Sequence, residues 1–140
     1  MSFNIDAGGA LSIAILFLAH LGLCAAYIQG GLVKLTDFPG AVAEMAHFRL
    51  APPALFAVLV IALELIASAM VMTGFLRWLG ALALAGFTLM STLIALRFWE
   101  QPAGEARHAD ANAFFEHLGL AGGFLLVAWL DLVRTATLDL

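Results

Sequence analysis

The chain has 140 residues, of which 64% are hydrophobic and 11% are charged, and its formal net charge is −4. A typical soluble domain has about 25% charged residues and could not hide this much apolar surface, so we predict a single membrane domain over residues 1–140. Six lysines and arginines without a basic cluster exclude nucleic acid as an expected partner. The single cysteine, Cys24, excludes an internal disulfide.

Four apolar runs predict four transmembrane helices, because a helix needs about 20 apolar residues to cross the hydrocarbon core. The expected spans are residues 8–33, 53–75, 78–96 and 113–133. Inside a bilayer, a helix satisfies all of its own backbone hydrogen bonds. The predicted fold class is therefore all-α, an integral membrane four-helix bundle.

Proline, glycine and polar residues predict the connections between the spans. In residues 34–52, Asp37 is expected to cap a short helix that has Pro39 in its first turn. One face of this helix would carry Ala41, Met45 and Phe48. We therefore expect a short amphipathic helix at the membrane interface between spans one and two. Gly74 predicts a tight turn, and residues 100–112 predict a surface loop.

Glu64 is the single charged residue in the apolar run of span two, close to its middle. A charge at the bilayer centre costs about 2.5–3.5 kcal/mol on insertion scales, so such residues have partners and often functions. His20 is near the middle of the antiparallel span one, so we expect a buried Glu64–His20 pair that shares a proton. Such a pair would serve as a proton relay or a polar ligand contact, or it would be a structural hydrogen bond between helices.

Span one also carries a stripe of polar and small residues at steps of four and three, which places them on one helical face. The stripe consists of His20, Cys24, Tyr27, Gly31 and Lys34. It is either a polar track from the midplane to the interface or a seam of helix packing.

Near the span ends, Arg77, Trp99 and His117 are further candidates for ligand contacts. Trp99 is expected to anchor the chain at the interface, where amphipathic rings are common. Glu44 and His47 of the first connection fall on the same membrane side as Lys34, Trp99 and His117, so these residues could form a site at headgroup level. The four histidines lack tight metal-ligand spacing, and we predict no metal site.

Several segments, in their order and spacing, resemble the DoxX family of small membrane proteins along nearly the whole chain. They are GGLVKLTDFPG, ALELIASAMVMTGFLRWLGALAL, LRFWE and FFEHLGLAGGFLLVA. The resemblance implies a multi-pass protein of the bacterial inner membrane. It marks as family-pattern positions Lys34, Pro39, Gly40, Glu64, Gly74, Arg77, Trp99, Gly122 and Gly123. Family members often have Arg near the position of His20 and Asn near that of His117, where this chain differs.

The resemblance also implies a function, because some relatives are linked to thiosulfate:quinone oxidoreductases and to membrane oxidoreductase complexes. It suggests an accessory subunit that interacts with quinone or lipid. The sequence has no paired cysteines, no glycine-rich dinucleotide fingerprint and no haem-spaced histidines, so quinone is the only cofactor considered and enzymatic activity stays open. The alternatives are a small proton-coupled transporter and a purely structural membrane protein. Small-residue helix faces favour a homodimer, and the family resemblance implies membership in a membrane complex.

Overall fold

The computed structural model describes residues 3–138, and side chains from residue 8 onward. Its elements are helices α1 (Phe3–Thr36), α2 (Phe38–His47), α3 (Pro53–Thr73) and α4 (Arg77–Ala95), the 3-10 turn η1 (Phe98–Glu100), and helix α5 (Glu105–Leu138). Within this part of the chain, four helices are long and apolar enough to cross a membrane: α1, α3, α4 and α5. The predicted all-α architecture is confirmed.

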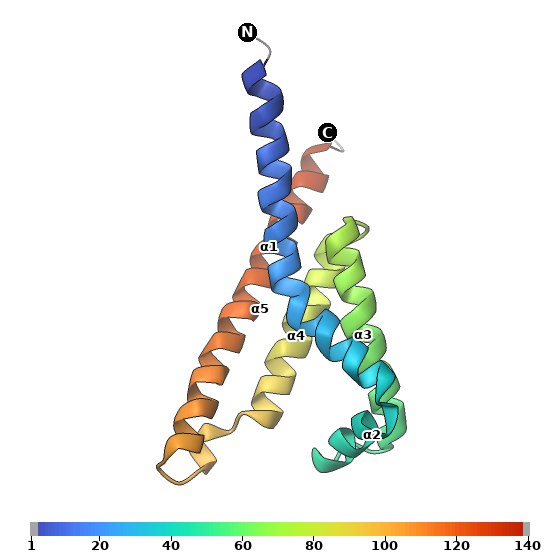
Figure 1. Cartoon of the computed structure of the whole chain (residues 1–140), viewed down its shortest axis with the longest axis vertical. Coiled ribbons are helices and arrows are strands. Elements are labelled where there is room, and N and C mark those ends of the chain that lie inside the picture. The colour runs from blue at the N-terminus through green and yellow to red at the C-terminus, as the bar shows by residue number, and fades with distance from the viewer. Residues whose placement is uncertain (1–2, 139–140) are drawn as a thin grey trace.

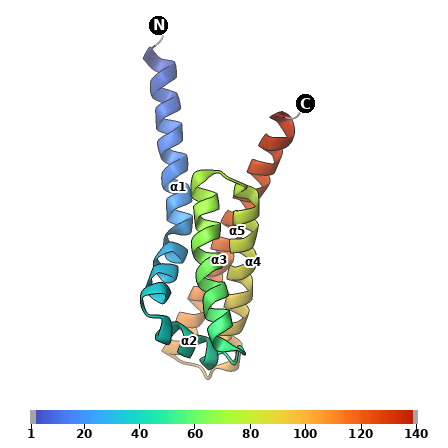
Figure 2. The ribbon, with the colours of Figure 1, turned by 90° about the vertical axis from the view of Figure 1, so that its right-hand side faces the viewer.

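The long helices alternate in direction, so both termini lie at one end of the molecule and α2 and η1 lie at the other (Figure 1). Helix α4 packs against α3 and α5, and α1 packs mainly against α3. Helices α1 and α5 contact each other through a few side chains, and their terminal parts diverge beyond the α3–α4 turn (Figure 2). The two outer helices are therefore connected mainly through α3 and α4.

The predicted interfacial helix is present as α2. Its N-terminus is capped by Asp37, whose Oδ1 accepts a hydrogen bond from the Gly40 backbone N at 3.1 Å. On the face turned to the bundle, Ala41 and Met45 are buried against Ala57 of α3. These contacts hold α2 across the end of the bundle, where it forms one wall of the site described below.

The α3–α4 connection is the tight turn expected at Gly74. This residue ends α3 with φ = 84°, a left-handed conformation that glycine adopts without strain. Arg77 begins α4, and its Nε donates a hydrogen bond to the Val71 carbonyl at 2.9 Å. Arg77 therefore serves the turn by satisfying a carbonyl in the last turn of α3.

The N-terminus of α4 is capped from another helix, which the sequence did not reveal. The preceding residue, Leu76, provides no side-chain cap. Instead, Asp131 of α5 accepts a hydrogen bond from the Trp78 backbone N at 3.1 Å, and its other oxygen lies 3.4 Å from Arg134. Asp131 is only 7% exposed. This buried carboxylate therefore joins α5 to α4 and faces the positive end of the α4 dipole.

The core between α1, α4 and α5 is centred on Tyr27. Its ring contacts Phe124 edge-on, with centroids 5.5 Å apart, and its hydroxyl bonds to Thr88. The Thr88 hydroxyl donates its hydrogen to the Leu84 carbonyl at 2.6 Å, so Tyr27 must be the donor to Thr88.

Between α3 and α4, a Cβ on Gly80 would lie 2.7 Å from the Ala67 carbonyl oxygen. A glycine is therefore required for these two helices to come this close.

One boundary was predicted wrongly. Helix α5 begins at Glu105, so most of the expected loop over residues 100–112 is helical. The physical reason is that Gly104 is the last glycine or proline before the apolar span, and the alanine-rich segment that follows has good helix propensity despite its charges. Polarity indicated where the apolar span begins, but it did not indicate where the helix begins.

Candidate functional site

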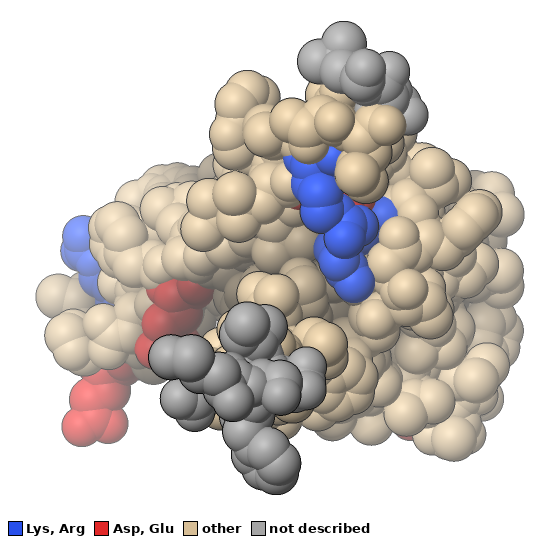
Figure 3. Space-filling model, turned by 90° about the horizontal axis from the view of Figure 1, so that it is seen from above, with Lys and Arg blue, Asp and Glu red and all other residues tan. Residues whose placement is uncertain are grey.

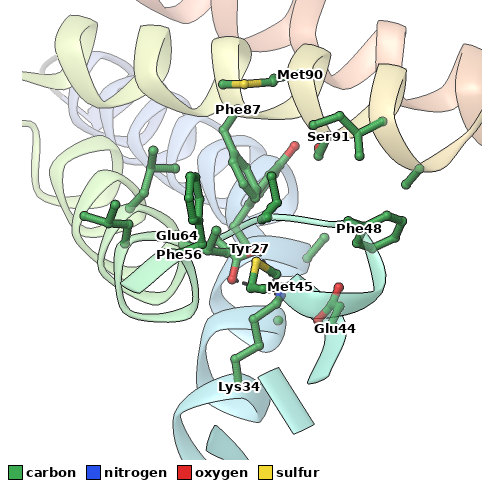
Figure 4. A pocket seen from close by; sticks show the side chains of 18 of the residues that line it. Tyr27, Lys34, Glu44, Met45, Phe48, Phe56, Glu64, Phe87, Met90 and Ser91 are labelled. Atoms are coloured by element: carbon green, nitrogen blue, oxygen red, sulfur yellow. Dashed lines mark hydrogen bonds and ion pairs between the residues drawn. The ribbon is translucent and has the colours of Figure 1, made fainter. Parts of the chain in front are cut away.

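A cavity of about 450 Å³ lies at the α2 end of the bundle and is lined by residues of all five α-helices (Figure 4). Most of the wall is apolar, with three phenylalanines and two methionines among the lining side chains: Phe48, Phe56, Phe87, Met45 and Met90. Ionisable side chains in the lining are Tyr27, Lys34, Glu44, Glu64 and His117. Small-molecule sites commonly combine a mostly apolar surface with a few polar groups in this way.

The central polar feature of the cavity is an ion pair between Lys34 of α1 and Glu64 of α3. Lys34 Nζ lies 3.2 Å from both carboxylate oxygens of Glu64. The Glu64 side chain is 7% exposed and the Lys34 side chain 16%. The carboxylate is thus almost fully buried, while the ammonium lies closer to the end of the bundle. Charges buried in an apolar helix bundle need such a partner.

Two glycines of α1 allow this helix to approach the carboxylate. A Cβ on Gly31 would lie 2.8 Å from the side chain of Leu65, so no larger residue fits there without movement. A Cβ on Gly30 would lie 3.5 Å from Glu64 Oε1, and Gly30 itself lines the cavity. The GGLVK segment therefore brings the α1 backbone close to α3 and then supplies the cation one turn later.

The predicted pairing of Glu64 with His20 is wrong, because Glu64 pairs with Lys34 instead. Among the described residues, no hydrogen bond or ion pair joins His20 to Glu64. His20 precedes Gly30 by ten residues, which is about 15 Å along a helix. It lies instead at the other end of the bundle, near Arg77 and Asp131. Matching the centres of the apolar runs failed because α1 extends well past the end of α3 toward the N-terminus.

The stripe predicted on span one does face the bundle. Cys24, Tyr27 and Gly31 are buried, and Lys34 is half-buried at the end of the stripe. Cys24 belongs to the hydrophobic core, whereas Tyr27 and Lys34 line the cavity. The stripe is thus a packing seam in its first half and a cavity wall in its second half, so both interpretations apply to different parts of it.

The structure separates the remaining predicted site residues. His117 lines the cavity, and its Nδ1 lies 2.6 Å from the Ala113 carbonyl oxygen. Trp99 lies outside the cavity lining, 48% exposed and packed edge-on against Phe98 and Phe114.

Arg77 lies at the opposite end of the bundle, together with Arg134. Seen from this end, which carries the termini, basic side chains gather in a small patch that has acidic atoms at its edge (Figure 3). Of the six predicted candidates, three line the cavity: Lys34, Glu64 and His117. The other three lie outside its lining: His20, Arg77 and Trp99.

Two further polar groups of the cavity are not among these six candidates. Glu44 of α2 lines the cavity beside Met45, and Ser91 of α4 lines it with its hydroxyl donating to the Thr88 carbonyl at 3.1 Å. Glu44 falls three residues after Ala41 and one before Met45, so helical spacing places it at the edge of the buried face of α2. The helical spacing of Glu44 was therefore visible in the sequence.

Over the described residues, no group of three or more histidine, cysteine or acidic side chains could hold a metal ion.

These features define a small multi-pass membrane protein with a polar ion pair inside an apolar cavity. The model of the DoxX family matches residues 15–97, and the chain belongs to this family. The matched segment includes both Lys34 and Glu64. A curated relative, the inner membrane protein YphA of Escherichia coli (strain K12), is 28% identical over 120 residues, which cover 86% of this chain and 85% of the relative. No solved structure matches the chain.

Proposed function

We propose that this DoxX-family protein is an inner-membrane subunit that binds an amphiphile of quinone or lipid size in the α2-end cavity. In this proposal it is an accessory component of a membrane oxidoreductase, as the family resemblance suggests. The observation that carries the proposal is the cavity itself, because about 450 Å³ of mostly apolar space surrounds a buried ion pair. An amphiphile matches such a lining, since its body and its polar end require different surroundings.

The proposed entry route is from the lipid. Leu59 and Met90 line the cavity, and they are also 53% and 61% exposed on the surface of the bundle. This surface faces hydrocarbon in a membrane-spanning bundle, so the cavity and the lipid share a boundary there. A lipid-soluble molecule can cross that boundary without passing through water.

Each polar residue has a distinct proposed role. Lys34 and Glu64 hold the polar end of the ligand at the bundle interior, and His117 provides its free ring nitrogen from the α5 side. The aromatic rings of Phe56 and Phe87 contact the apolar body. The chain has one cysteine and no motif for a bound redox cofactor, so electrons would be carried by the ligand and by a partner subunit.

The test is mass spectrometry of the protein extracted within patches of its own membrane lipid. Ser91→Phe places a ring in the cavity, and Leu89→Phe is its control, because Leu89 is exposed on the same helix and does not line the cavity. We expect one amphiphile to be enriched with the wild type and with Leu89→Phe, and depleted at least about fivefold with Ser91→Phe. Equal recovery of all lipids from the three proteins would contradict the proposal.

The buried ion pair also supports a second candidate, a proton-coupled transporter that uses Glu64 as its proton carrier. Substrate-dependent proton flux in proteoliposomes that disappears in Glu64→Gln would favour it over the accessory role. A purely structural pair would show a third pattern. Glu64→Gln would then lower thermal stability while leaving both the flux and the co-purified lipids unchanged.

A further inference from the structure

We propose that the cavity selects ligands by charge: it admits an amphiphile whose polar end is uncharged and accepts a hydrogen bond, and it rejects anionic headgroups. This inference rests on the proposed function and specifies the chemical class of the ligand. It arises from the charges of the lining, from their burial and from the hydrogen bonds that the lining groups already make.

The first argument is the charge of the lining. Among the described lysine and arginine side chains, Lys34 alone lines the cavity, and Glu44 and Glu64 supply two carboxylates. Counted over these three side chains, the lining has one negative charge in excess. Lys34 is also neutralised at close range, because both oxygens of Glu64 lie 3.2 Å from its Nζ. An anionic group would meet no free cation among the described lining residues, and it would share the cavity with the carboxylate of Glu44.

The second argument is the hydrogen-bonding capacity that remains. The ammonium of Lys34 has three N–H donors, and two of them point to Glu64, which leaves one for a ligand. The hydroxyls of Tyr27 and Ser91 already donate to Thr88. At its buried end, the cavity thus offers a ligand one N–H donor, which belongs to Lys34, and the charge of this ammonium is balanced by Glu64. An uncharged acceptor such as a carbonyl oxygen matches this donor without adding a buried charge.

The third argument concerns cations. A cationic headgroup near Glu64 would lie close to Lys34, which occupies the same part of the cavity (Figure 4). The lining thus disfavours anions throughout and disfavours cations at its buried end.

The test uses three photoreactive probes with the same alkyl body and diazirine. Their polar ends are a methyl ketone, a sulfonate and a trimethylammonium group. The full-length protein in lipid nanodiscs is labelled, and the labelled residues are mapped by mass spectrometry. We compare Phe87, which lines the cavity, with Leu89, which faces lipid on the same helix. We expect the ketone to label Phe87 at least about fivefold more than either charged probe, after normalisation to Leu89.

A charge-reversal variant tests the cause. Glu44→Lys gives the lining one positive charge in excess, and Glu44 is exposed, so the variant is expected to fold. We expect it to raise sulfonate labelling of Phe87 relative to ketone labelling by at least about fivefold. Glu116→Lys is the matched control, because Glu116 is an exposed acid on α5 outside the cavity lining, and it should leave the ratio unchanged.

The outcomes separate this inference from the proposed function. If no probe labels Phe87 in preference to Leu89, the cavity does not bind amphiphiles and both proposals fail. If the sulfonate or the trimethylammonium probe labels Phe87 as strongly as the ketone, the site binds amphiphiles and the charge selection alone is overturned. An unchanged labelling ratio in Glu44→Lys would likewise overturn it.

Discussion

Removing Lys34 leaves the carboxylate of Glu64 in the bundle interior without a counter-charge. The Glu64 side chain is 7% exposed, so water cannot replace the lost ammonium, and breaking a buried pair in this way costs about 3–5 kcal/mol. We therefore expect Lys34→Met to lower the free energy of unfolding by about 3 kcal/mol, the lower end of that range. Methionine keeps the apolar length of the side chain, so the loss reports mainly on the charge.

Removing the other partner should cost less. Lys34 is two residues from the end of α1, and its side chain is 16% exposed. In Glu64→Gln the ammonium can turn toward the interface, as lysines near span ends do, so we expect a loss of about 1–2 kcal/mol. The double variant Lys34→Met, Glu64→Gln has no buried charge left at this position. It should be at least about 1 kcal/mol more stable than Lys34→Met alone.

The measurement is reversible unfolding of the four proteins in mixed micelles, followed by far-ultraviolet circular dichroism. A double-mutant cycle then gives the coupling free energy of the pair, expected at about 2 kcal/mol. The reasoning is refuted if this coupling is below about 0.5 kcal/mol, or if Glu64→Gln destabilises the protein more than Lys34→Met does.

Changes at three further positions, Asp131, Gly80 and His20, test other parts of the structure. Asp131→Ala removes the cap of α4 and should lower the unfolding free energy by about 1–2 kcal/mol, while Asp131→Asn keeps an acceptor and should lose about half as much in the same assay. Gly80→Ala forces α3 and α4 apart and should cost about 1–3 kcal/mol in a thermal melt. Gly86→Ala, whose Cβ would meet nothing within 4 Å, is its control and should be neutral or stabilising. His20→Ala should leave amphiphile recovery unchanged, and a loss equal to that of Ser91→Phe would contradict the placement of the site.

The architecture was predictable because lipid strongly constrains the chain. Long apolar runs must be helical to satisfy their backbone groups, and these runs gave the four spans. The cap at Asp37 and the turn at Gly74 were also predictable, since each depends on local chemistry at one or two residues. The start of α5 was not, because polar residues between Gly104 and the apolar span form a helix as readily as a loop.

The site was predicted in part, and the error concerned the depth of His20 along the bundle relative to Glu64. Glu64 was identified correctly as a buried charge, and Lys34 was identified as the end of the inward stripe. Their pairing was missed because depth was estimated from the middle of each apolar run. That estimate requires helices of equal length and tilt, and α1 and α3 have 34 and 21 residues. Contacts between helices depend on register, which one sequence does not specify.

This difference in length has a consequence for how the membrane itself acts on the protein. Helix α3 spans about 32 Å and matches a typical hydrocarbon core, whereas the apolar part of α1, Gly8–Thr36, measures about 43 Å. Hydrophobic mismatch of this size is relieved by helix tilt, by a kink or by local thickening of the bilayer. We therefore expect α1 to respond to bilayer thickness more than α3 does. The same helix carries Lys34 near its other end, so the ion pair belongs to the helix on which the bilayer is expected to act most.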